Sequence, residues 1–156
     1  MNKKLIILAL ATSVFATGCS ISTSTITCTN TSKKDMGTTD NTYTIKFKDD
    51  KMSGLDYEST VELSTDYYNN EDIYSYQFNY LYQQVESIYS TISDEAYQFN
   101  IKKVGTDKIN YSIKLDVEKA RDETINMLFQ KYNLTKDSTK EDVKLAYENL
   151  GFTCQE

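Results

Sequence analysis

Histidine, proline and tryptophan are all missing from the 156 residues of this chain. Histidine is the commonest general base near neutral pH and a leading metal ligand in proteins. Its absence excludes every Ser-His-Asp or Cys-His catalytic arrangement. Because no other catalytic or ligand-spacing motif takes its place, we predict no catalytic residue, no metal site and no cofactor.

Basic residues are scarce relative to acidic ones, with 17 lysines and arginines against 23 aspartates and glutamates. Proteins that bind nucleic acids need clusters of basic residues to neutralise the phosphates. The acidic balance therefore argues against a nucleic-acid partner, whereas it leaves cationic partners open.

The N-terminus has the features of a bacterial lipoprotein signal. Lys3-Lys4 form a short positive region, and the apolar run from Leu5 to Phe15 is too short to span a bilayer. Ala16-Thr17-Gly18-Cys19 then resembles a lipobox, although leucine is more usual than alanine at its first position. We predict that residues 1–18 are removed and that Cys19 carries a diacylglycerol. The alternative is ordinary secretion with Cys19 as a free thiol.

Removal of the signal defines the expected organisation of the mature chain. Residues 19–25 are predicted to form a lipidated tether, and residues 26–156 are long enough for a single domain with a core. Because the signal contains two lysines and no acid, the mature chain keeps 15 basic and 23 acidic residues, a net charge of −8. We expect this domain at the extracytoplasmic face of the cell membrane, held by the lipid on Cys19.

Cys28 and Cys154 are the other two cysteines of the chain. Extracytoplasmic compartments are oxidising, so we predict a disulfide between them. It would close a long loop and stabilise the fold by about 4–5 kcal/mol in the chain-entropy model. Two free thiols are the alternative, and a redox pair is disfavoured because no C-x-x-C motif is present.

Two segments alternate apolar and polar residues on both sides of a turn, which is typical of β-hairpins. The first is residues 43–63, with the turn at Asp49-Asp50-Lys51 and a β-bulge expected at Gly54. The second is residues 97–117, with the turn at Gly105-Thr106-Asp107. Residues 25–30 are predicted to form an earlier strand, and the polar residues 31–41 a loop.

Apolar residues at spacings of three and four predict three helices. The first, about residues 66–92, is expected to be capped by Ser64 or Thr65 with Asp66 and to bury Ile73, Tyr76, Tyr80, Leu81, Val85, Ile88 and Ile92. The second, about residues 118–133, is expected to bury Ile125, Leu128, Phe129 and Tyr132. The third follows a capping box at residues 138–141 and ends before Gly151.

Strands before and after a long helix, followed by two more helices, indicate an α+β fold. We expect a single antiparallel sheet built from two hairpins, with three helices packed mainly on one face. The other face would carry threonine, lysine and acidic residues and lie in contact with water.

The order of these elements resembles that of the YehR-like small bacterial lipoproteins, a family of unknown function. The features that carry the resemblance are the lipobox, the two hairpins around a long helix, and short pieces such as residues 44–51, 112–117 and 150–152. The resemblance would cover most of residues 25–156. It implies a membrane-anchored α+β domain and implies no reaction.

Tyrosine is concentrated in one part of the chain, since seven of the 13 tyrosines lie between residues 67 and 89. Tyr74, Phe78 and Tyr82 are spaced four apart, so they would line one side of the first helix. We consider them a candidate platform for a glycan strand or a protein partner. The alternative is that these tyrosines pack in the core or are scattered exposed residues.

Adjacent acidic residues occur at Asp49-Asp50, Glu71-Asp72 and Glu141-Asp142. Acidic residues are stabilising near helix N-termini, and aspartates are frequent in turns. These structural roles are sufficient, so we assign none of the three pairs to a metal or catalytic site.

Three functions remain, and we favour a non-catalytic lipoprotein that binds an envelope ligand or protein partner. The second is a hydrolase of cell-wall polymers that uses two carboxylates. The third is a structural or assembly factor of the envelope. A deep pocket with facing carboxylates would favour the hydrolase, an aromatic groove would favour binding, and a flat apolar patch would favour assembly.

Overall fold

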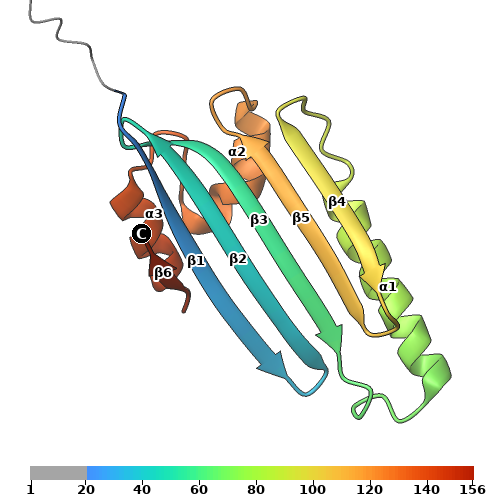
Figure 1. The fold of residues 1–156 in the computed structure, drawn as a ribbon. Coiled ribbons are helices and arrows are strands. Elements are labelled where there is room, and N and C mark those ends of the chain that lie inside the picture. Colours follow the sequence, from blue (N-terminus) through green and yellow to red (C-terminus); the bar gives the residue numbers. More distant parts are fainter. Residues whose placement is uncertain (1–20) are drawn as a thin grey trace, which may run out of the picture.

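The computed structural model describes residues 21–156, so Cys19 and the predicted signal at residues 1–18 lie outside the described residues. The fold is α+β, with one six-stranded antiparallel sheet in the order β4-β5-β3-β2-β1-β6 (Figure 1). The strands are β1 (Thr23–Lys34), β2 (Gly37–Lys48), β3 (Lys51–Leu63), β4 (Tyr97–Val104), β5 (Lys108–Asp116) and β6 (Thr153–Gln155). Within residues 21–156, no helix combines the length and the apolar character needed to cross a bilayer.

The first three strands form a meander that is longer than expected. Residues 31–41 were predicted as a loop, which is wrong: they continue β1 and β2, which stay paired as far as Lys34 and Gly37. The threonines of this segment favour strand structure. The alternation that marks a strand is weak here because most of these side chains, on both faces, are at least partly exposed.

A glycine is required where β2 begins. Gly37 has a φ of 151°, and a Cβ at this position would overlap the carbonyl oxygen of Glu62 on β3. The backbone of β2 therefore approaches β3 more closely at this point than a larger residue would allow.

The hairpin of β2 and β3 has the predicted turn. Asp49 and Asp50 both adopt positive φ, 49° and 62°, as a two-residue type I′ turn requires. The strand register then shifts between Lys46 and Phe47, because Lys46 pairs with Gly54 while Phe47 pairs with Met52. This irregularity is the predicted β-bulge next to Gly54.

The second hairpin, β4 and β5, joins the same sheet because β5 pairs with β3 along nine residues. The short strand β6 adds to the opposite edge by pairing with β1. A sheet of two hairpins was therefore too simple an expectation, since β1 and β6 extend it to six strands.

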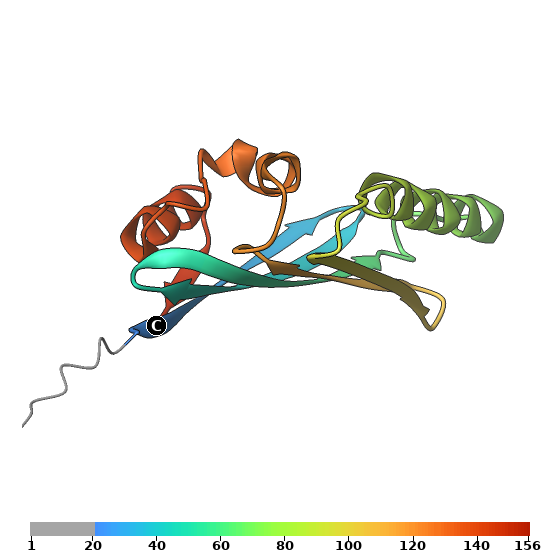
Figure 2. The same cartoon turned by 90° about the horizontal axis from the view of Figure 1, so that it is seen from above.

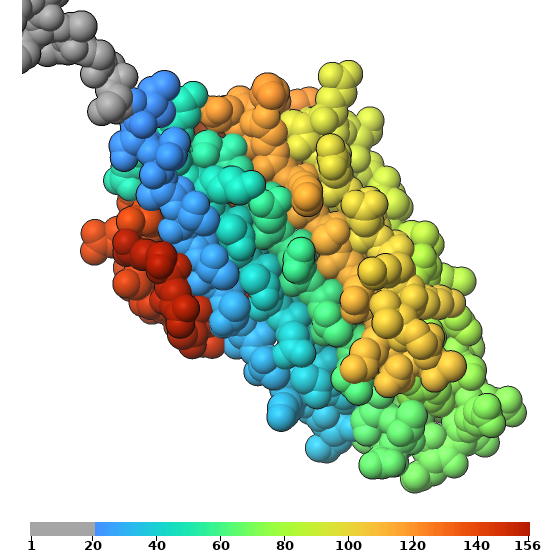
Figure 3. All heavy atoms as spheres, in the orientation of Figure 1, coloured from blue at the N-terminus to red at the C-terminus, as the bar shows by residue number. Residues whose placement is uncertain are grey.

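The helices are α1 (Glu71–Tyr89), α2 (Asp122–Phe129) with the 3₁₀ turn η1 (Gln130–Tyr132), and α3 (Lys140–Glu148). Figure 2 shows the three α-helices on the same side of the sheet, with α1 over the β4 side, α3 over the β1 side and α2 between them. The opposite face is free of helices, and Figure 3 shows its strands lying side by side. We call this the open face; Thr29, Lys46, Glu58 and Lys114 are exposed on it.

Three helix starts differ from the prediction. α2 begins at Asp122 and not near residue 118. α1 begins later than residue 66, because Asn70 is its N-cap and its side chain accepts hydrogen bonds from the backbone N–H groups of Asp72 and Ile73. The capping box of α3 lies one residue later than expected and joins Thr139 to Asp142. Gly151 ends α3 as predicted, with a φ of 81°.

Buried tyrosines join the sheet to the α2–α3 layer. The Tyr43 ring stacks on Tyr57 at a centroid distance of 4.2 Å, and the Tyr132 hydroxyl donates a hydrogen bond of 3.1 Å to the Tyr43 hydroxyl. Tyr147, fully buried, stacks on Tyr132 at 4.6 Å. Burial raises the pKa of Tyr43 and Tyr147 far above the ordinary value, so both stay neutral.

Candidate binding surface

The start of β1 is fixed to the sheet immediately after the predicted anchor. The Ser22 N–H donates a hydrogen bond of 3.0 Å to the Asp49 carboxylate, and the Asp49 N–H donates one of 2.8 Å to the Ser22 carbonyl. We call this end of the sheet, with the β2–β3 turn, the anchor end. The distal end carries the β1–β2 and β4–β5 turns and the start of α1 (Figure 1). The 12 residues of β1 separate the two ends by about 40 Å.

Most of the exposed large apolar residues lie at the distal end or on α1, and the others are Ile21, Met127, Leu145 and Leu150. The N-terminal half of α1 contributes Ile73, Tyr76 and Tyr80, at spacings of three and four residues that place them in one row. We call this row the outer face of α1. Tyr76 and Tyr80 are 65% and 50% exposed, and their rings stack at a centroid distance of 6.3 Å.

The predicted platform is not an exposed surface. Tyr74 and Phe78 are only 8% and 6% exposed and Tyr82 is half-buried, because this side of α1 faces the sheet. The Tyr74 hydroxyl donates to the Thr106 carbonyl in the β4–β5 turn at 3.2 Å. The prediction that Tyr74, Phe78 and Tyr82 form an open platform is therefore wrong, and the three residues dock α1 onto the second hairpin.

The apolar spacing predicts that Ile73, Tyr76, Tyr80 and Ile88 are buried, which is wrong, because all four are exposed. The helix has apolar residues in almost every direction, so spacing alone does not select the buried side. A usable signal was the length of each row. In the outer row the positions four and seven after Tyr80 are Gln84 and Ser87, whereas the inner row continues to Val85 and Tyr89, which are partly buried.

A hollow of about 1230 Å³ lies near the anchor end, and charged side chains line much of it. Two of its four carboxylates form ion pairs: Asp56 pairs with Lys46 at 2.7 Å, and Asp116 pairs with Lys119 at 2.7 Å. The hydrogen bond from Lys119 lowers the pKa of Asp116. A general acid needs a pKa raised toward the working pH, and this carboxyl is shifted in the opposite direction.

Asp94, also in this hollow, connects the segment before β4 to the start of α2. Its carboxylate accepts hydrogen bonds from the Thr124 hydroxyl at 2.6 Å, the Arg121 N–H at 2.9 Å and the Ala96 N–H at 3.0 Å. These bonds, that of Thr124 first, lower the pKa of Asp94 to about 2. The arrangement stabilises the ionised carboxylate and has a structural role.

The acidic pairs singled out from the sequence have structural positions. Asp49-Asp50 form the β2–β3 turn, and Glu71-Asp72 and Glu141-Asp142 lie in the first turns of α1 and α3. In the described part of the chain, no three cysteine or acidic residues are close enough together to hold a metal ion.

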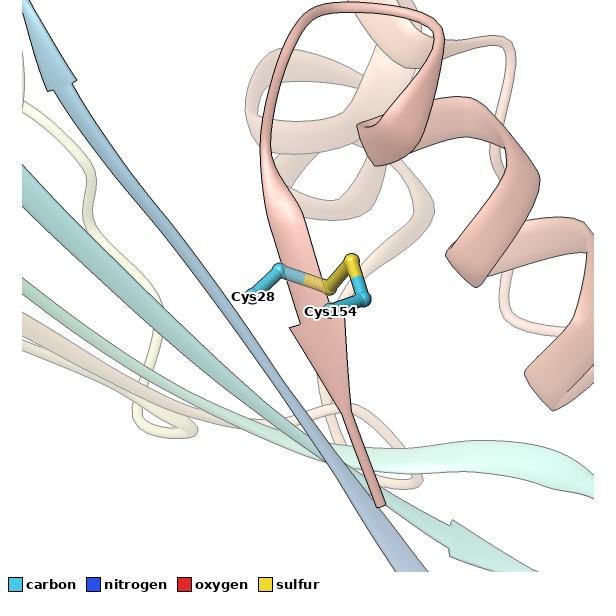
Figure 4. The surroundings of a disulfide bond; sticks show 2 residues. All are labelled: Cys28 and Cys154. Carbon is cyan, nitrogen blue, oxygen red and sulfur yellow. A yellow bond between two sulfur atoms is a disulfide. The ribbon is translucent and has the colours of Figure 1, made fainter.

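The predicted disulfide is present. Cys28 on β1 and Cys154 on β6 are directly opposite each other, and their sulfur atoms are bonded at 2.04 Å (Figure 4). The bond ties the last strand of the chain to the first. Both sulfur atoms lie on the side of the sheet that carries α3.

Comparison with protein-family models and with curated protein sequences found no match. Two solved structures are similar in fold. A protein from Streptococcus pneumoniae TIGR4 aligns with 99% of this chain and 98% of its own, at 15% identity and a TM-score of 0.52. Escherichia coli YehR aligns with 82% of this chain and 88% of its own, at 13% identity and a TM-score of 0.55. The chain therefore has a YehR-like fold, and at these identities the likeness extends to the fold alone.

Proposed function

We propose that the protein is a membrane-anchored, extracytoplasmic lipoprotein whose domain is non-catalytic and binds an envelope ligand or protein partner. The observation that carries the proposal is that the link to the predicted anchor and the outer face of α1 lie at opposite ends of the strands. The chain is tied to the sheet at Ser22, next to the lipobox, while the outer face of α1 begins at the opposite end.

The link between the predicted lipid on Cys19 and the sheet is short, which bears on how the domain would be oriented at the membrane. Only Ser20 and Ile21 separate Cys19 from Ser22, and the three Cα–Cα steps between them can span only about 10 Å when extended. Two acyl chains on Cys19 would hold the anchor end close to the lipid headgroups. The start of α1, about 40 Å along the strands, would then face away from the membrane, where a partner in the envelope can reach it.

Binding explains the described residues better than the alternatives do. A wall hydrolase would need an available carboxyl pair, whereas three of the four carboxylates in the hollow near the anchor end, those of Asp56, Asp94 and Asp116, are paired or hydrogen-bonded, which leaves Glu95 alone. An assembly factor would need a broad apolar patch, whereas the exposed apolar residues of α1 are the row Ile73, Tyr76 and Tyr80 and, two turns further on, Ile88. No specific observation favours either of these functions.

The anchor is tested by growing cells with a labelled fatty acid. We expect label on the wild-type protein in the membrane fraction and none on Cys19→Ser. Label on Cys19→Ser, or wild-type protein in the cytosol with its leader attached, would contradict the proposal.

The partner is tested by photo-crosslinking in intact cells. A photoreactive residue in place of Tyr76 is expected to form a discrete adduct, whose analysis distinguishes glycan from protein. The matched control is the same residue in place of Thr29, which is exposed on the open face of the sheet. Equal adducts from both positions, or none from Tyr76, would rule out binding at the distal end.

A further inference from the structure

Helix α1 carries two aromatic pairs with the same four-residue spacing on opposite sides. On the inner side, Lys103 of β4 covers the pair Phe78 and Tyr82, with its ammonium 5.6 Å and 4.9 Å from the ring centroids. The same ammonium donates a hydrogen bond of 2.7 Å to the Asn79 side chain between them. In this fold, a cation from a neighbouring strand therefore covers an aromatic pair of α1.

The outer pair, Tyr76 and Tyr80, has no such cation. Within residues 21–156, lysines lie over the rings of Phe78, Tyr82 and Tyr132, and none lies over the outer pair. α1 itself contains no lysine or arginine that could supply one. The two stacked rings thus expose faces that attract cations.

The charges around the outer pair have the sign that a cation requires. Glu71 and Asp72 lie in the first turn of α1, and Asp72 precedes Tyr76 by four residues, so it lies on the same side of the helix. Two full negative charges outweigh the partial positive charge of the helix N-terminus. Ile73 adds an apolar contact in the same row.

We propose that the outer face of α1 binds a cationic polypeptide segment of an envelope partner, with a lysine or arginine side chain over Tyr76 and Tyr80. The segment's charge complements Asp72 and the acidic chain as a whole. This inference deepens the proposed function and rests on it for the partner's location, since binding itself requires no lipid on Cys19.

The test is a titration of the full chain, purified as its host produces it, with a labelled peptide of alternating lysine and serine. We expect binding that weakens with salt, and much weaker binding of an otherwise identical peptide with glutamine in place of lysine. The variant Tyr76→Leu/Tyr80→Leu keeps the apolar bulk and removes most of the attraction of the rings for cations. It is expected to bind the lysine peptide about tenfold more weakly.

Two matched variants make the result specific. Tyr67→Leu replaces an exposed tyrosine outside the outer face and should bind like the wild type, whereas Asp72→Asn should bind about threefold more weakly. Equal binding of the two peptides, or unchanged binding by Tyr76→Leu/Tyr80→Leu, would overturn the inference. A glycan adduct from position 76 would also overturn it and leave the proposed function standing. If the peptide bound but the protein carried no fatty-acid label, this inference would be supported and the predicted lipid anchor on Cys19 would be contradicted.

Discussion

Replacing both Cys28 and Cys154 with alanine is expected to lower the free energy of unfolding by about 5 kcal/mol. The two cysteines are 126 positions apart in the chain. In the chain-entropy model, a loop of that length removes about 16–17 cal/mol/K from the unfolded state, which corresponds to about 5 kcal/mol at 25 °C. The effect acts through the unfolded chain, so the folded contacts of the variant should be almost unchanged.

The folded state contributes less to this loss. β6 pairs with β1 through three residue pairs, so the edge strand would fray more easily without the bond. Phe152, just before β6, still packs edge-on against Tyr147 at a centroid distance of 5.2 Å. For a domain of roughly 140 residues, a loss of about 5 kcal/mol lowers the melting temperature by about 17 °C.

Urea and thermal unfolding followed by circular dichroism measure both quantities. Reduced wild-type protein should unfold like the alanine variant, because both lack the bond. The control is Thr29→Ala/Thr153→Ala, the neighbouring pair across the same two strands, which keeps the disulfide and should lose less than about 1 kcal/mol. A loss below about 2 kcal/mol in the double-alanine variant, or an equal loss in the control, would refute the loop-closure reasoning.

Two further predictions concern single residues. Asp94→Asn should lower the urea midpoint at neutral pH. Because the pKa of Asp94 is lowered from 3.8 to about 2 in the folded state, its contribution is complete above pH 3.8 and is lost as the pH falls through 2. A difference from wild type that stays constant between pH 5 and 2 would contradict this role. Gly37→Ala should cost about 2 kcal/mol or more, because its Cβ meets the Glu62 carbonyl. Gly151→Ala also has positive φ but opens onto free space, so it should cost only about 1 kcal/mol, and equal losses would show that the contact at Gly37 is unimportant.

The sequence predicted those parts of the fold that local rules govern. The turn at Asp49-Asp50 and the two hairpins follow from alternation and turn chemistry, and the disulfide follows from the predicted compartment and the number of cysteines. Residues 31–41 escaped prediction because strand pairing there depends on neighbours distant in the chain and buries few side chains. β6 escaped because three residues are too few to show a period.

The outer face of α1, the candidate site, was not predicted for a different reason, which also bears on the role of α1. A helix that only covered a sheet would need one apolar face, and α1 has a complete one in the row from Tyr74 to Tyr89. Its second row, Ile73, Tyr76 and Tyr80, adds nothing to that contact and leaves large apolar surface in water. Periodicity detects both rows equally, because it measures apolar character and not which side meets the sheet. The outer row is thus the feature of α1 that folding does not explain, and the proposed binding role would account for it. If Tyr76→Leu/Tyr80→Leu proved as stable as wild type while losing the partner, the division of α1 into a folding side and a binding side would be established.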